Sequence, residues 1–254
     1  MTDFTKDGIL HCGECKQPKE KIIQFGDKTL RPRILCKCEL EEKQRQEEQE
    51  KEWARLDRID RLREYCFDDK ELKGCTFDNA DDSEVIKVAK NYAEKFEELN
   101  NTGLLLYGSV GTGKTFSACC IANALLDKGY SCYVTTFPKI VNKIQSTFDK
   151  QEYIDHLVSF DLLIIDDLAS ERNTEYMNEI VTNVIDSRYR TNKPIVITTN
   201  LTADEMKNPT DIAQQRIQSR IMEMCYPFEV KGTDRRRNAR KTITEKYKGV
   251  LENG

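Results

Sequence analysis

The chain has 254 residues and a formal net charge of −4, and its length predicts one large domain accompanied by a smaller one. No apolar run approaches the ~18–20 residues that cross a bilayer, so we expect no membrane segment. Residues 1–8 lack the apolar core of an export signal, and we therefore expect a cytoplasmic protein. The negative charge disfavours nucleic acid as a partner only if that charge is evenly distributed along the chain.

Near the N-terminus lie two close pairs of cysteines, separated by a twenty-residue loop: Cys12 and Cys15, then Cys36 and Cys38. Without an export signal these thiols should be reduced, and four thiolates are the ligands of a closed structural Zn²⁺ site. We therefore predict a zinc-binding module over residues 1–38 that needs the metal to fold. The alternatives are a redox pair at Cys12 and Cys15, which lacks a thioredoxin-like βαβ context, and a ligand role for His11.

A charged connector is predicted over residues 39–70. From Glu39 to Glu64 the sequence has ten acidic and seven basic residues and neither glycine nor proline, which predicts a helix. Apolar residues recur every third position only in its second half, at Trp53, Leu56, Ile59 and Leu62. A solvated spacer is the simpler interpretation, and a partner-binding helix is the alternative.

From residue 71 to residue 254 apolar strands alternate with helical patterns. The predicted strands are Leu104–Tyr107, Ser131–Thr136, Leu162–Asp166, Pro194–Asn200 and Phe228–Val230. The predicted helices are Glu84–Leu99, Thr115–Lys128, Glu175–Tyr189 and Asp211–Met224. This alternation indicates an α/β domain with a mostly parallel sheet that helices cover on both faces.

The first of these strands leads directly into a complete phosphate-binding motif, Gly108-Ser109-Val110-Gly111-Thr112-Gly113-Lys114-Thr115. A helical pattern follows at once, so the motif has the strand–loop–helix context that it requires. In such a loop, backbone N–H groups surround phosphate oxygens at the positive end of a helix. We expect Lys114 to reach the β- and γ-phosphates of ATP, and Thr115 to bind Mg²⁺.

Two later strands end in polar residues, at the edge of a parallel sheet where ligands bind. Asp166 and Asp167 close a buried strand; in isolation they are equally typical of an ordinary turn. Beside a phosphate-binding loop, we expect Asp166 to orient Mg²⁺ and Asp167 to polarise the attacking water. Asn200 ends the next strand and is expected to hydrogen-bond the γ-phosphate or that water, with capping of the following helix as the alternative.

Basic residues concentrate in two places despite the overall negative charge. Lys139 and Lys143 share a helical face between Phe137 and Phe148, and residues 231–248 carry eight basic residues against two acidic ones. Lysines interleaved with aromatic rings suit single-stranded DNA, which they bind through its backbone and its bases. An ordinary amphipathic helix with its isoleucines in the core is the alternative for the first group.

From about residue 77 to residue 237 the chain resembles the AAA+ ATPases of the bacterial replicative helicase loader group (the DnaC/DnaI type) and their transposon-encoded relatives of the IstB type. The resemblance is carried by Gly108–Thr115, Leu162–Asp167, Ile197–Asn200, Gln215–Ile221 and Gly232–Arg236. It implies side-by-side assembly with ATP at each junction, Asn200 as the sensor 1 residue and Arg220 as an arginine finger supplied in trans. It also implies Arg236 as the sensor 2 residue, with Arg235 as the competing choice.

The resemblance implies an ATP-dependent loader of a replicative DNA helicase that binds ATP, Mg²⁺, single-stranded DNA and the hexameric helicase. The helicase contact would lie in the cysteine-rich module, and the DNA contact at Lys139 and Lys143. We thus expect a P-loop AAA+ parallel sheet with flanking helices over residues 71–254, preceded by the zinc module and the helical connector. The alternatives are an IstB-type transposition ATPase, a P-loop kinase of nucleotides or metabolites, and a zinc adaptor with a vestigial nucleotide site.

Overall fold

The structure is a computed structural model that describes residues 2–168, 175–209, 212–235 and 248. It divides into two compact units, Met1–Arg58 and Ile59–Gly254. The division falls inside a long helix, α1 (Lys37–Cys66). None of the helices in the described ranges is long and apolar enough to span a membrane.

The N-terminal unit contains two short antiparallel hairpins within residues 2–36. β1 (Phe4–Lys6) pairs with β2 (Ile9–His11), and β3 (Ile23–Phe25) pairs with β4 (Lys28–Leu30). An isolated two-stranded hairpin is at best marginally stable in water, so these hairpins need support from other interactions.

The first half of α1 lies in the N-terminal unit and is largely exposed. Lys37 and Lys43 lie 3.7 Å from Glu41 and Glu47, respectively, one helical turn further on. Such pairs stabilise an exposed helix modestly, which explains how a segment without an apolar stripe remains helical. Two short 3₁₀ turns, η1 (Lys70–Gly74) and η2 (Phe77–Asn79), follow the helix.

Within the described residues, the C-terminal unit is built on a five-stranded sheet in the order β6-β7-β8-β5-β9, and all neighbouring strands are parallel. The strands are β5 (Gly103–Tyr107), β6 (Cys132–Thr136), β7 (Leu162–Asp166), β8 (Ile195–Thr199) and β9 (Cys225–Glu229). The predicted α/β class with a parallel sheet is confirmed. The last strand begins at Cys225 instead of Phe228, because β9 is an edge strand and tolerates Pro227.

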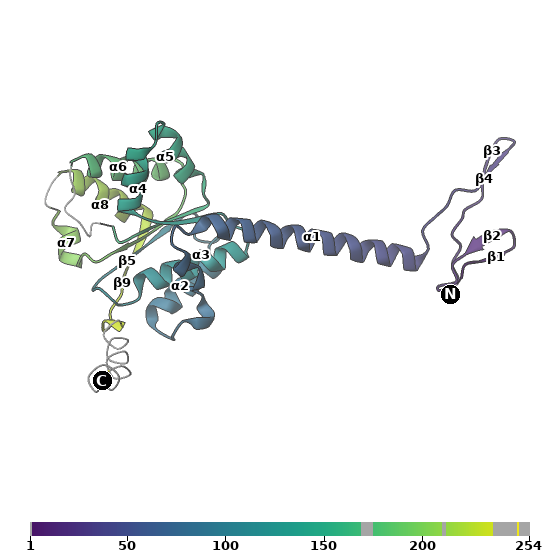
Figure 1. Ribbon diagram of the computed structural model, residues 1–254, viewed down its shortest axis with the longest axis horizontal. Helices are drawn as coiled ribbons and strands as arrows, with labels where there is room; N and C mark the ends of the chain where they lie inside the picture. Colours follow the sequence, from purple (N-terminus) through teal and green to yellow (C-terminus); the bar gives the residue numbers. More distant parts are fainter. Residues whose placement is uncertain (1, 169–174, 210–211, 236–247, 249–254) are drawn as a thin grey trace. The chain divides into compact units, whose positions relative to one another are not determined.

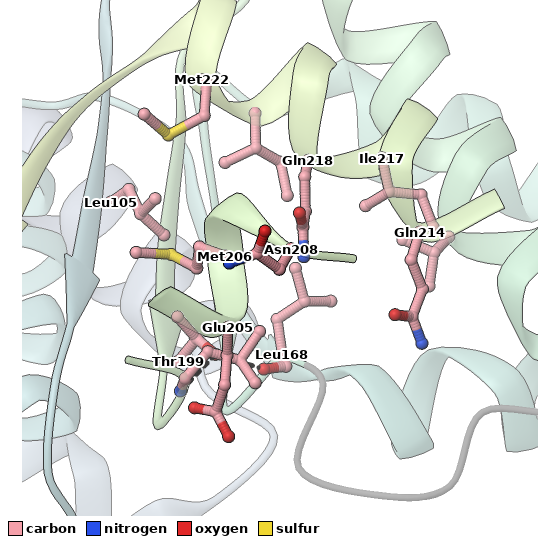
Figure 2. Close-up of a pocket in the computed structure, with 13 residues that line it drawn as sticks. Leu105, Leu168, Thr199, Glu205, Met206, Asn208, Gln214, Ile217, Gln218 and Met222 are labelled. Atoms are coloured by element: carbon pink, nitrogen blue, oxygen red, sulfur yellow. Dashed lines mark hydrogen bonds between the residues drawn. The ribbon is translucent and has the colours of Figure 1, made fainter. Parts of the chain in front are cut away.

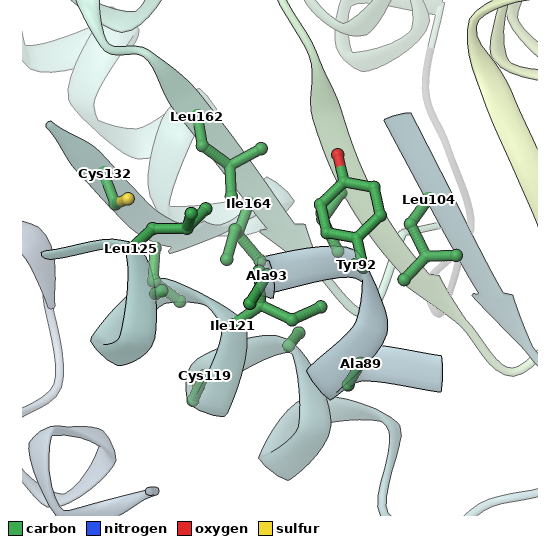
Figure 3. Close-up of a cluster of buried hydrophobic side chains, with 14 of the residues drawn as sticks. Ala89, Tyr92, Ala93, Leu104, Cys119, Ile121, Leu125, Cys132, Leu162 and Ile164 are labelled. Carbon is green, nitrogen blue, oxygen red and sulfur yellow. The ribbon is translucent and has the colours of Figure 1, made fainter. Parts of the chain in front are cut away.

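Helices cover both faces of this sheet (Figure 1). One face carries α2 (Glu84–Glu94) and α3 (Lys114–Asp127); the other carries α4 (Phe137–Ser146), α5 (Lys150–Ser159), α6 (Glu175–Arg190), α7 (Ala203–Lys207) and α8 (Ile212–Met224). In the first layer, Ile121 of α3 packs with Leu162 and Ile164 of β7 (Figure 3). Successive strand residues point to opposite faces, so Leu163 and Ile165 belong to the other apolar cluster.

Candidate functional site

The strand order brings the predicted polar residues together. Because β8 lies between β5 and β7, Asn200 at its end lies between the phosphate-binding loop and the two aspartates. Lys114 Nζ donates to Asn200 Oδ1 at 2.8 Å, and Asn200 Nδ2 donates to Asp167 Oδ1 at 2.6 Å. Three residues that are far apart in the sequence therefore form one connected polar group.

The loop between β5 and α3 has the backbone that phosphate binding requires. Gly111 and Gly113 have φ angles of 78° and 100°, in the left-handed region that favours glycine. At Gly111 a Cβ atom would also collide with the side chain of Asp234, which would have to move to admit a larger residue. Gly113 is the N-cap of α3. The N–H groups of a first helical turn point away from the helix toward its N-terminus, where they can bind an anion.

The ammonium group of Lys114 is buried within this loop. Its Nζ donates to the carbonyl oxygens of Gly108 at 2.7 Å and Ser109 at 2.8 Å, in addition to Asn200. An ammonium group donates only three hydrogen bonds, so phosphate oxygens of a bound nucleotide would replace loop carbonyls as acceptors.

Thr115 and Asp166 form the pair of oxygen ligands expected for Mg²⁺. Thr115 Oγ1 donates to the Asp166 carboxylate at 2.8 Å, and Thr198 Oγ1 donates to it at 2.6 Å. Burial raises the pKa of Asp166 above its ordinary value, although both hydrogen bonds oppose this. A divalent cation would supply the positive charge that this buried carboxylate lacks, and hydroxyl and carboxylate oxygens suit Mg²⁺.

Asp167 adopts a backbone conformation that is uncommon outside glycine. Its φ is 57°, a value that aspartate and asparagine tolerate better than most residues. Its N–H donates to Thr198 Oγ1 at 2.9 Å, which fixes the turn after β7. Thr198 therefore supports both aspartates, a role that the sequence did not assign to it.

A cavity of about 610 Å³ connects this polar group to a segment that sequence reasoning missed. Besides the predicted residues, which include Arg235, and Thr198, its lining comprises Leu72, Cys75, Asn79, Asp81 and Phe116. Cationic and hydroxyl groups together with apolar walls are what a nucleotide requires for its phosphates and its base. No motif marks residues 70–83, because their contribution depends on how two short turns pack beside α3.

Of the two arginines considered for sensor 2, Arg235 lies at this cavity, and Arg236 falls outside the described residues. The guanidinium of Arg235 lies 3.0 Å from Asp81 Oδ2 and donates to Ser83 Oγ at 3.1 Å. Its backbone N–H donates to the carbonyl oxygen of Gly111 at 3.0 Å. Arg235 is thus held beside the phosphate-binding loop through both its side chain and its backbone.

A different cavity, of about 270 Å³, lies between α7, α8 and the end of β8 (Figure 2). Leu105, Leu168, Met206 and Ile217 contribute to its mostly apolar lining. Glu205 is its titratable lining residue within the described ranges, and this carboxylate caps α7. None of the described lining residues of this cavity is cationic, whereas Lys114 and Arg235 line the loop cavity, which is therefore the nucleotide-site candidate.

The predicted arginine finger is absent from the described lining of its own nucleotide cavity. Arg220 lies on α8, with its guanidinium 4.3 Å above the ring centroid of Tyr189. Arg216, one turn earlier on the same helix, is exposed. Neither arginine is among the described lining residues of the nucleotide cavity.

The predicted DNA-binding lysines, Lys139 and Lys143, are both exposed on α4. The opposite face of this helix is buried through Ile140 and Ile144, as in the amphipathic-helix interpretation. Phe137 is only 3% exposed and belongs to the core, so its ring is unavailable for base stacking.

In the N-terminal unit the structure brings the four predicted zinc ligands together. Their sulfur atoms all lie within 4.8 Å of one another, with separations of 3.6 Å for Cys12–Cys38 and 3.9 Å for Cys36–Cys38. A tetrahedral site with Zn–S bonds of about 2.3 Å requires sulfur–sulfur distances of about 3.8 Å. The residues present therefore fit a structural zinc ion.

The thiols also show why a cation is needed. Backbone hydrogen bonds from Gln17 and Cys38 lower the pKa of Cys15 to about 6. The neighbouring Cys15 sulfur, followed by burial, raises the pKa of Cys38 to about 12. Four thiolates at this distance repel one another unless a positive ion balances their charge. His11 instead stacks on Phe4, with 5.6 Å between the ring centroids.

The parallel sheet, the phosphate-binding loop and the paired aspartates define a P-loop ATP-binding domain with an AAA+-like fold. The sequence profile of the family described as IstB-like ATP binding protein matches residues 30–242, which is most of the chain. The chain belongs to this family.

The relatives of the chain include proteins named as helicase loaders. "Replicative helicase loader DnaI" of Bacillus subtilis (strain 168) is 27% identical over 186 residues, which are 66% of this chain and 60% of the relative. "Replicative helicase loader DnaC" of Escherichia coli (strain K12) is 26% identical over 159 residues, 59% of this chain and 63% of the relative. The chain thus matches less than two thirds of the length of either protein.

Solved structures support the fold. A structure described as that of DnaI has a TM-score of 0.59 at 23% identity and covers 69% of this chain and 99% of its own. A structure of the DnaC helicase loader has a TM-score of 0.57 at 22% identity, covering 64% and 100%, respectively. The AAA+ fold expected from the resemblance is confirmed.

Proposed function

We propose that this protein is an ATP-dependent loader of a replicative DNA helicase. The observation that carries the proposal is the polar group in which Lys114, Asn200 and Asp167 are joined by hydrogen bonds of 2.8 and 2.6 Å. It occurs in a chain whose relatives are named replicative helicase loaders. A nucleotide site alone would fit many ATPases; the relatives and the cysteine-rich unit favour a loader.

In the proposed hydrolysis, Lys114 binds the β- and γ-phosphates and Asp167 accepts a proton from the attacking water. Asn200 contacts both Lys114 and Asp167, and its amide group would orient the attacking water. Thr115 and Asp166 would hold Mg²⁺, which when bound neutralises phosphate charge. The hydrogen bonds among Lys114, Asn200 and Asp167 orient these side chains before ATP binds. Polar groups that are oriented in advance need little reorganisation during the reaction.

Arg220 would complete the site from a second copy of the chain, since it lies on α8 away from its own cavity. This requires self-association through AAA+ interfaces, with ATP between two subunits. Such an arginine stabilises the negative charge on the transferred phosphoryl group in the transition state.

Replacing Arg235 with Ala should weaken ATP binding about tenfold or more, because a charge-assisted hydrogen bond contributes ~1.5–3 kcal/mol and ~1.4 kcal/mol corresponds to a factor of ten. Titration of a fluorescent ATP analogue measures this. Arg190→Ala, at the exposed end of α6, is the matched control. If Arg236→Ala weakens binding and Arg235→Ala does not, the sensor 2 role belongs to Arg236.

The double substitution of Lys139 and Lys143 by Ala should weaken single-stranded DNA binding and reduce its salt dependence. Losing two phosphate contacts lowers the slope of log K against log salt by about 1.4. Fluorescence anisotropy of an oligonucleotide at several salt concentrations measures both quantities. The matched control is Lys87→Ala with Lys90→Ala, two exposed lysines of α2 on the other face of the sheet. Unchanged affinity and slope would place the DNA contact elsewhere.

Helicase capture tests the loader proposal at the N-terminal unit. In the β3–β4 hairpin, Ile23, Phe25 and Leu30 share one face and are 42%, 78% and 54% exposed. Exposed apolar side chains in such a cluster are typical of a protein interface. Ile23→Ser with Phe25→Ser should reduce capture of the purified hexameric helicase of the host at least tenfold, whereas Gln24→Ser with Thr29→Ser on the other face should not. A wild-type protein that fails to bind this helicase would contradict the proposal.

An IstB-type transposition ATPase is the second candidate, favoured by the family profile over residues 30–242. The cysteine cluster and the long charged helix favour the loader instead. Capture of a transposase partner without capture of the helicase would support the second candidate.

A further inference from the structure

We propose that Tyr189 and Asp186 of α6 are positioning residues that hold Arg220 ready for a neighbouring copy of the chain. This inference rests on the trans role of Arg220 in the proposed function. The guanidinium carbon of Arg220 lies 4.3 Å from the centroid of the Tyr189 ring. Its Nε atom lies 3.4 Å from Asp186 Oδ1. A ring and a carboxylate thus contact the same guanidinium group.

The holding residues are themselves fixed. Tyr189 Oη donates to Glu223 Oε1 at 2.7 Å, and the other oxygen of Glu223 lies 3.4 Å from Arg220 Nη1. Residues three apart on a helix lie on one face, so Asp186 and Tyr189 of α6 form one side of the contact. Arg220 and Glu223, also three apart, form the other side on α8. The two helices pack against each other, which makes the arrangement independent of any loop.

This arrangement restrains a side chain that would otherwise be mobile. An exposed arginine samples many rotamers, and ordering it during reaction carries an entropic cost. Stacking fixes the plane of the guanidinium, and the two carboxylates contact it through Nε and Nη1. The side chain is still 43% exposed, and the two carboxylates contact Nε and Nη1 but not Nη2. Arg220 can therefore remain oriented while offering a terminal amino group to a phosphoryl oxygen.

The contacts differ from those that hold the fold together. Asp186 and Tyr189 are half-buried, and ion pairs and cation–π contacts that remain accessible to solvent contribute little to stability. Removing the Tyr189 ring or the Asp186 charge should therefore leave the domain folded. The effect should appear in the site that receives the arginine, which belongs to a different molecule.

The test measures ATP hydrolysis in mixtures of two full-length variants. The acceptor carries Arg220→Ala, which keeps its own phosphate-binding loop but supplies no arginine. The donor carries Lys114→Ala, which disables its own site but retains Arg220. Each variant alone should have little activity, and an equal mixture should regain turnover at acceptor sites that face a donor.

Adding Tyr189→Ala or Asp186→Asn to the donor should lower the kcat of the mixture about tenfold with little change in KM. The same change in the acceptor should have at least a fivefold smaller effect. Tyr189→Phe in the donor keeps the stacked ring and should restore at least half of the turnover. Tyr65→Ala in the donor is the matched control, since this tyrosine is 73% exposed on α1.

The outcomes distinguish the positioning role of Tyr189 and Asp186 from the trans role of Arg220 and from the proposed function. An equal loss from donor and acceptor, or a fall in Tm that accompanies the loss, would indicate a structural role and overturn the inference, as would no loss in either. An inactive donor–acceptor mixture from an active wild-type protein would refute the trans role of Arg220, and the inference with it. A wild-type protein without ATPase activity would refute the proposed function itself.

Discussion

Replacing Asp167 with Asn should lower kcat for ATP hydrolysis at least about 100-fold while leaving ATP affinity nearly unchanged. A positioned general base contributes about 10²–10⁴-fold, and an amide is a far weaker base than a carboxylate. Binding depends on Lys114 and the loop, which the change does not touch. Phosphate release gives kcat, and titration of ATP gives the dissociation constant.

The backbone makes this substitution a clean test. Asp167 has a φ of 57°, which asparagine tolerates well, so the turn after β7 should keep its shape. Asn200 Nδ2 can still donate to the remaining carbonyl oxygen of the new side chain. Asp155→Asn, at an exposed position of α5, provides the matched control and should turn over ATP normally. Normal hydrolysis by the Asp167→Asn variant would remove this carboxylate from the mechanism.

The phosphate-binding loop and the polar strand ends were predictable because each lies in one short stretch of sequence. Lys114 and Thr115 follow a strand and begin a helix, a context visible in the local pattern. The residues that contact them in space could not be predicted from local sequence. That Asn200 lies between Lys114 and Asp167 depends on β8 entering the sheet between β5 and β7, and strand order is a tertiary property.

The missed residues share this cause. Arg235 was considered for sensor 2, but its partner Asp81 lies more than one hundred and fifty residues away, in a segment that no motif marks. Thr198 was visible as part of a polar strand end, but its partners were not. Because strand side chains alternate, Thr198 lies on the same side of β8 as Val196, and there it contacts Asp166. In α4, by contrast, local sequence was sufficient: the spacing of Ile140 and Ile144 correctly predicted that one face of this helix is buried.

Removing zinc should unfold the N-terminal module while the five-stranded sheet and the helices packed on it retain their fold. Within residues 2–38, the buried apolar residues are Cys12 and Cys36, which are themselves predicted ligands. A segment without a core has little else to stabilise it, whereas zinc contributes an apparent ~10–16 kcal/mol in zinc-finger peptides. Chelation, or Cys38→Ser, should abolish stoichiometric zinc and make the module susceptible to limited proteolysis.

His11→Ala separates the four-cysteine site from the alternative in which this histidine is a ligand. The ring of His11 stacks on Phe4, so its loss should loosen β1 and β2 slightly but leave zinc content at one ion per chain. Metal analysis of the purified variants measures this directly. Protein that contains no zinc and whose proteolysis is insensitive to chelators would contradict the site. The short Cys12–Cys38 separation would then have to be maintained by protonated thiols, and the Cys12 and Cys15 pair would become the candidate for redox chemistry.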